Sequence, residues 1–163
     1  MKSTVIFAAI ISFAAVSLAG SPSVLSIVPA AAQCGSEIEV VVKGGLLDDA
    51  RTLLFDLPGI EVGGVNAVEK EKFTDKSKIA PDARIDEYAF RAVTASGISD
   101  VRLFYVTPYP LLKEADEEKF GTGKVQSVPM GMTIYGSAPG GDQDLYEVEL
   151  KKGQRPRNKH HRA

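Results

Sequence analysis

The chain has 163 residues, enough for one domain or for one small domain with part of a second. It carries 19 basic and 21 acidic side chains, but six of the basic ones lie in 151–163, so residues 1–150 hold 13 basic against 21 acidic groups. This acidic body argues against nucleic acid as a partner, and the single cysteine, Cys34, excludes an internal disulfide.

The N-terminal segment is typical of a secretory signal. Met1 and Lys2 precede the apolar run "VIFAAIISFAAVSLA", which ends at Ala19. A membrane span needs about 20 apolar residues, and this run is shorter and rich in small side chains. Small residues before Gly20 suit a signal peptidase. We therefore predict cleavage after Ala19 and export to the periplasm, the cell surface or the medium, without a stable membrane span; an uncleaved anchor is the alternative.

The segment from Gly20 to Val106 carries the period of β-strands. Ile38, Val40 and Val42 alternate with charged residues, and a second alternation runs through "EYAFRAVT". Glycine, proline and aspartate separate these short runs at nearly regular spacing. Such a pattern predicts an antiparallel β-sandwich.

The remainder of the chain divides into a linker, a second β unit and a tail. "LLKEADEEKF" is acidic and flanked by proline and glycine, which favours a linker over a helix. From Lys124 onward we expect about three strands, the last with Tyr146, Val148 and Leu150 on one half-buried face. Two or three strands rarely fold alone, so this unit looks incomplete. The basic end from Arg155 has no alternation.

The second unit, "SVPMGMTIYGSAPGGDQDLYEVELKKGQ", resembles the first half of a bacterial pre-peptidase C-terminal domain. The matching positions are a strand that ends in glycine, an Asp-x-Asp-x-aromatic-x-Val-x-apolar strand and a Lys-Gly turn: Gly136, Asp142, Asp144, Tyr146, Val148, Leu150 and Gly153. The block before it is similar to the Ig-like or TIG-like domain that precedes this module in exported proteins of planctomycete type, with Pro29, Gly35 and Glu37 at its opening.

The resemblance implies an all-β protein: an Ig-like antiparallel β-sandwich followed by a partial, truncated β-sandwich or jelly-roll-like domain. The expected organisation is a signal peptide (1–19), an Ig-like sandwich (20–106), an acidic linker (107–123), a partial pre-peptidase C-terminal-like domain (124–154) and a basic disordered tail (155–163). We expect a frameshift or truncation at the tail; a natural short form and a tail with its own role are the alternatives.

The resemblance also implies a calcium site. Some members of the family bind calcium through the acidic linker and an early pair of aspartates, and by position these ligands are Glu114, Asp116, Glu118, Asp142 and Asp144. Calcium prefers six to eight oxygen ligands from carboxylates and carbonyls. The linker lacks the asparagine that the family pattern carries, which removes one oxygen. The alternative is that the aspartates shape a turn and the linker acids are solvated.

Catalysis finds little support in the residue types. A nucleophile needs a histidine as base, and both histidines, His160 and His161, lie in the basic tail. We therefore expect a non-catalytic binding or spacer module, a fragment of a larger secreted or cell-surface protein, whose partners are protein, peptide or polysaccharide. The alternatives are an accessory domain of a secreted peptidase or other hydrolase, and a calcium-stabilised structural module.

Overall fold

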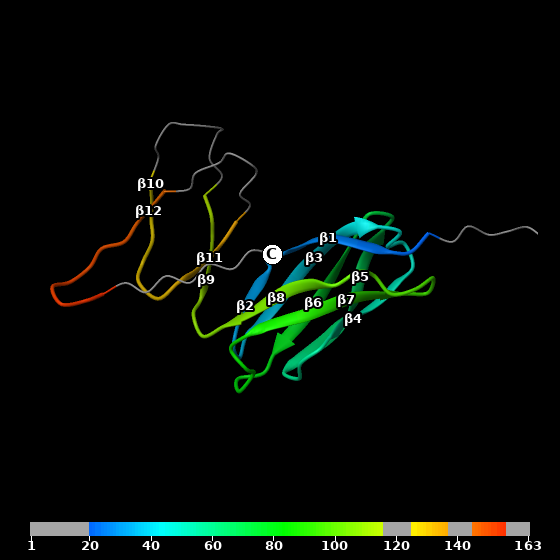
Figure 1. Ribbon diagram of the computed structural model, residues 1–163, viewed down its shortest axis with the longest axis horizontal. Helices are drawn as coiled ribbons and strands as arrows, with labels where there is room; N and C mark the ends of the chain where they lie inside the picture. Colours follow the sequence, from blue (N-terminus) through cyan, green and yellow to red (C-terminus); the bar gives the residue numbers. More distant parts are fainter. Residues whose placement is uncertain (1–19, 116–124, 137–144, 156–163) are drawn as a thin grey trace, which may run out of the picture.

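The computed structural model describes residues 20–115, 125–136 and 145–155, and within these ranges the chain forms twelve strands and no helix (Figure 1). The predicted all-β class is confirmed. The strands are β1 (Ser23–Val28), β2 (Ala31–Gln33), β3 (Glu37–Gly45), β4 (Ala50–Phe55), β5 (Ile60–Glu69), β6 (Lys72–Ile79), β7 (Glu87–Thr94), β8 (Arg102–Thr107), β9 (Leu111–Lys113), β10 (Val125–Ser127), β11 (Thr133–Tyr135) and β12 (Leu145–Glu147).

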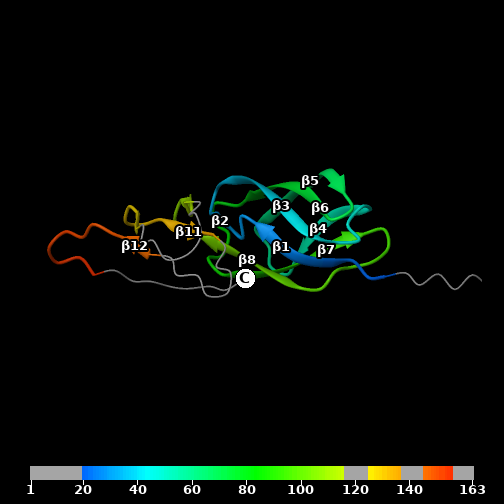
Figure 2. The same cartoon turned by 90° about the horizontal axis from the view of Figure 1, so that it is seen from above.

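Two four-stranded sheets form a sandwich (Figures 1 and 2). The first sheet has the order β1-β3-β6-β5 and is antiparallel throughout. The second has the order β2-β8-β7-β4, in which only β2, next to β8, is parallel to its neighbour. When β1 and β2 are counted as one strand that changes sheets at Pro29 and Ala30, this is the arrangement of a constant-type immunoglobulin sandwich.

Apolar side chains from both sheets fill the space between the layers. The predicted alternation in β3 and β7 is confirmed, because Val40 and Val42 point inward, as do Tyr88 and Phe90. The ring of Phe55 packs 5.7 Å from Phe90 and 5.8 Å from Phe104, measured between centroids. Full burial of such a side chain contributes about 1.5–3 kcal/mol. The sandwich core is assembled entirely from residues between Val24 and Val106.

The inward face of β6 is partly polar, and this strand was absent from the sequence-based prediction. Asp75 is fully buried and accepts hydrogen bonds from the Ser77 hydroxyl at 2.8 Å and from the Gly64 amide at 3.2 Å. Gly64 lies at an irregularity of β5 between Val62 and Val65, with a φ of 115° that favours glycine. The aspartate therefore satisfies a backbone donor that the bulge removes from the β5–β6 ladder.

A buried tyrosine anchors the entry to β7. Tyr88 has no exposed surface, and its hydroxyl donates to the carbonyl oxygens of Arg84 at 3.0 Å and Pro58 at 3.3 Å. A tyrosine near the start of this strand that bonds to the backbone a few residues upstream is a hallmark of immunoglobulin-like sandwiches. Its burial raises the pKa of the Tyr88 hydroxyl.

Strands β9 to β12 form two small parallel pairs, β9–β11 and β10–β12, beyond the end of the sandwich that carries β2 (Figures 1 and 2). Strand β9 lies within the stretch predicted as a linker. Only Val128 is buried among the apolar residues described after Val106. The prediction of a half-buried face on the last strand is wrong, because Tyr146, Val148 and Leu150 are all exposed and β12 ends at Glu147. A pair of short strands offers no second layer to cover that face.

Residues 1–19, which hold the predicted signal peptide, and residues 156–163 of the tail lie outside the described ranges. In the part of the chain that is described, no helix is long and apolar enough to cross a membrane.

Candidate functional site

The two outer faces of the sandwich differ in chemistry. On the first sheet, β3 and β6 present acidic side chains opposite basic ones: Glu37 lies opposite Lys78, and Glu39 opposite Lys76. The nitrogen–oxygen distances are 3.8 Å and 3.9 Å, and all four side chains are well exposed. Opposite charges across neighbouring strands contribute only a few tenths of a kcal/mol to about 1 kcal/mol each. We call this surface of β3 and β6 the charged face; the exposed aliphatic residues of this sheet, Leu25 and Val28, lie on its edge strand β1.

The outer face of the second sheet is mostly apolar. The strand registers place its members side by side: Thr52 opposite Val93, Leu54 opposite Arg91, Ala89 opposite Leu103, and Glu87 opposite Tyr105. A bridge from Val93 adds Ile98 at the edge. We call this surface the apolar face, and its members are Thr52, Leu54, Glu87, Ala89, Arg91, Val93, Ile98, Leu103 and Tyr105.

Two large aliphatic side chains of the apolar face are more than half exposed, Leu54 by 53% and Ile98 by 55%. Val93 lies beside Ile98, and Ala89 and Leu103 lie opposite each other further along β7 and β8; all three are half-buried. An antiparallel sheet normally presents polar side chains to water. Aliphatic side chains that gather on one exposed sheet face make that face a candidate contact surface.

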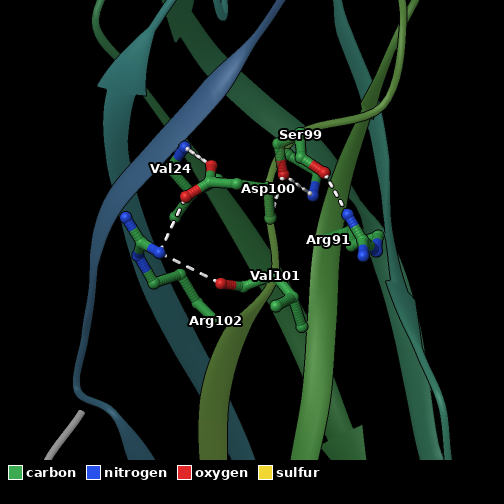
Figure 3. Close-up of polar contacts among 7 residues, drawn as sticks. Val24, Arg91, Ser99, Asp100, Val101 and Arg102 are labelled. Atoms are coloured by element: carbon green, nitrogen blue, oxygen red, sulfur yellow. Dashed lines mark hydrogen bonds and ion pairs between the residues drawn. The ribbon is translucent and has the colours of Figure 1, made fainter.

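The turn between β7 and β8 is fixed by a network of polar contacts (Figure 3). The Ser99 hydroxyl accepts a hydrogen bond from the Ala92 amide at 2.9 Å and donates to the carbonyl of Asp100 at 2.8 Å. Asp100 accepts from the Val24 amide of β1 at 2.7 Å, and its other carboxylate oxygen lies 2.7 Å from the Arg102 guanidinium. These bonds join the turn to the opposite sheet and hold Ile98 at the edge of the apolar face.

Two charged residues interrupt the apolar face, both on β7. The exposed Arg91 donates to the carbonyl of Ser99 at 2.7 Å, which ties the guanidinium to the β7–β8 turn (Figure 3). Glu87 lies two positions before Ala89, and Arg91 two positions after it. Burial, and then the charge of Glu87, raise the pKa of the neighbouring Tyr105 hydroxyl. The face therefore carries an acid, Glu87, on one side of the small central Ala89 and a base, Arg91, on the other.

Of the residues predicted to bind calcium, Glu114 alone is described. It follows β9, its amide donates to the carbonyl of Tyr135 at 2.9 Å, and its carboxylate accepts a hydrogen bond from the Tyr146 hydroxyl at 2.5 Å. The other predicted ligands lie outside the described residues: Asp116, Glu118, Asp142 and Asp144. Among the side chains that the structure places, no three acids, cysteines or histidines come together as metal ligands.

The close approach of Glu114 explains a glycine in the predicted motif. A Cβ atom on Gly136 would lie 1.7 Å from a carboxylate oxygen of Glu114. A side chain at position 136 would therefore require Glu114 to shift. The strand-ending glycine of the motif therefore has a packing role here.

The lone cysteine lies away from the apolar face, before β3. Cys34 is half-buried, and its thiol donates to the carbonyl of Ala83 at 3.5 Å. His160 and His161 lie beyond the described residues.

The apolar face was not singled out from the sequence, although the signal is present in β7. In "EYAFRAVT" the inward residues alternate with Glu87, Ala89, Arg91 and Val93, so two of the four outward residues are apolar. A strand that is apolar on both sides is typical of a sheet covered on both faces. No protein-family model matches the chain, and no match was found among curated proteins.

Proposed function

We propose that this chain is an exported, non-catalytic binding module that contacts a protein partner through the apolar face of its second sheet. The observation that supports this proposal is the difference between the central strands of the two sheets: β3 and β6 present paired charges, whereas Leu54, Val93, Ile98 and Leu103 lie on the outer face around β7. Export follows from the predicted signal at residues 1–19.

The shape and chemistry of the face favour protein over the other expected partners. The surface is the flat side of a sheet with aliphatic side chains, and protein interfaces have such apolar centres with polar rims. A polysaccharide site would need aromatic side chains and many hydrogen-bonding groups, whereas the centre of this face holds Ala89 and Leu103. Binding would use a preformed rigid surface, which keeps the entropic cost of association low.

The test is affinity capture from the culture medium and the cell envelope of the producing organism. The wild-type chain is compared with a Leu54→Asp/Ile98→Asp variant, in which both changes fall on side chains that are more than half exposed and so leave the core intact. The control is Val28→Asp, a similar change at an exposed valine on the edge strand of the other sheet.

We expect a partner that is retained by the wild type and by Val28→Asp and is lost with the double variant. Circular dichroism and thermal melts confirm that all three proteins are folded. Equal retention by all three would overturn the proposal, because the apolar face would then contribute nothing to binding.

A further inference from the structure

The charges on the apolar face point to one particular partner, a second copy of this chain. This inference rests on the proposed function and names the occupant of the same face. Glu87, Ala89 and Arg91 follow one another at alternate positions of β7, and all three lie on the outer side of the sheet. At about 3.4 Å per residue, each charge lies about 7 Å from the central alanine, on opposite sides of it.

A two-fold axis through the position above Ala89 turns this pattern into a self-complementary one. If the axis lies in the interface and runs perpendicular to β7, the two β7 strands face each other in opposite directions. Arg91 of each copy then faces Glu87 of the other, while Leu103, directly opposite Ala89 in the register, faces its own counterpart near the axis. A symmetric dimer needs such a surface, because the same patch serves both subunits.

The alternative two-fold orientation is unfavourable. An axis parallel to β7 would place Arg91 opposite Arg91 and Glu87 opposite Glu87. Like charges that face each other across an interface cost several kcal/mol. Of these two orientations the charges therefore favour the first, and aligned packing of two sheets at about 10 Å leaves room for the leucine side chains between them.

The hydrogen-bonding capacity of the two charged groups allows this pairing. Arg91 uses one nitrogen for the Ser99 carbonyl, and a guanidinium has five N–H donors. A carboxylate has about four acceptor sites, so Glu87 can accept from a second copy in addition to its contacts within the chain. We infer that the module forms a symmetric homodimer through the apolar face, with two reciprocal Arg91–Glu87 ion pairs.

The experiment is sedimentation velocity of the full chain from about 1 µM to about 1 mM, the range in which weak complexes dissociate. The proteins are the wild type, Glu87→Arg, Arg91→Glu, the double exchange Glu87→Arg/Arg91→Glu, and Lys76→Glu as a control on the charged face. Each single exchange places like charges opposite each other and should weaken dimerisation at least about tenfold.

The decisive sample is an equal mixture of the two single variants. Glu87→Arg carries two arginines and Arg91→Glu two glutamates, so neither pairs with itself but each complements the other. We expect the mixture and the double exchange to regain the dimer, although both lack the Arg91–Ser99 bond on at least one chain. That recovery separates the interface charge from a merely structural effect of losing Arg91.

A wild type that stays monomeric over the whole range overturns the inference, as does a dimer that the single exchanges leave unchanged. Either result leaves the proposed function intact if capture of another protein still depends on Leu54 and Ile98. If no dimer forms and capture does not depend on Leu54 and Ile98 either, the apolar face is not a binding surface.

Discussion

At the scale of single residues, buried polar groups decide how this sandwich is held. Asp75 and Tyr88 are both fully buried, and each satisfies backbone groups that the ladders leave unpaired. When one partner of such a buried hydrogen bond is removed, the other is left buried and unsatisfied, which typically costs about 1–3 kcal/mol of stability. Asp75 and Tyr88 therefore stabilise the fold through hydrogen bonds, although they are polar residues in the core.

Replacement of Tyr88 by phenylalanine should destabilise the protein by about 1–2 kcal/mol, because the carbonyls of Arg84 and Pro58 lose their donor. For a domain of this size that is a fall in Tm of several degrees, at about 4–8 °C per kcal/mol. The control is Tyr109→Phe, at a tyrosine that is half exposed. An unchanged Tm for Tyr88→Phe would show that the two hydrogen bonds contribute nothing.

The same variant tests the raised pKa of Tyr88. Because the folded pKa lies above the unfolded value of about 10, the folded state retains the proton more firmly. Its contribution to stability is fully present below pH of about 10 and is lost as the pH rises through the folded pKa. The Tm of the wild type should therefore fall more steeply above pH of about 10 than that of Tyr88→Phe; Tyr105 contributes to both proteins alike. Parallel pH profiles would contradict this assignment.

Sequence reasoning succeeded where inward positions were apolar and failed where they were not. The alternation of Val40 and Val42 predicted their burial correctly. Asp75 and Ser77 occupy equivalent inward positions of β6, and two polar residues in that row concealed the strand. Their burial depends on the bulge at Gly64 in a neighbouring strand, which no local pattern reveals.

At the scale of elements, the β9–β11 pair brings Glu114 close to Gly136. Gly136→Ala would place a methyl group 1.7 Å from a carboxylate oxygen of Glu114 and 2.8 Å from its Cβ, so the pair must separate or shift. We predict faster hydrogen exchange at the Glu114 amide, which donates to Tyr135 in the wild type. Adding Glu114→Ala should restore part of the protection, because the carboxylate is removed but the Cβ remains.

Exchange at the Glu114 amide that is equally fast with and without Gly136→Ala would show that the pair does not depend on this close approach. An amide of the sandwich, such as that of Ile79, which donates to Ser36 at 2.8 Å, serves as the internal control and should keep its protection in every variant.

The elements after the sandwich were predicted less well than those within it. Strands near 125 and 133 and the strand at Leu145 exist, but each has three residues. The alternation of Tyr146, Val148 and Leu150 indicated a half-buried strand, yet all three are exposed. Periodicity states which side chains share a face, whereas burial requires a second layer, which the described strands here do not supply.

At the scale of the whole molecule, composition and strand spacing predicted the sandwich, but the candidate site came from sheet order. Leu54, Arg91 and Leu103 belong to three strands, and only the order β8-β7-β4 places them on one surface. The resemblance to a pre-peptidase C-terminal domain predicts a site at acidic residues after Lys113 instead. The apolar face lies on the earlier domain, in residues that the motif does not include.

The central claim is that the second sheet of the sandwich, and not the first, meets another protein. The most direct measurement is photo-crosslinking in the producing cell, with a photoreactive phenylalanine analogue at position 54 or 98, and at position 76 on the charged face as control. Our account predicts crosslinked products from positions 54 and 98 and none from position 76; a product at twice the mass of the chain would identify the homodimer. Crosslinks from position 76 alone, or equally from all three positions, would contradict it.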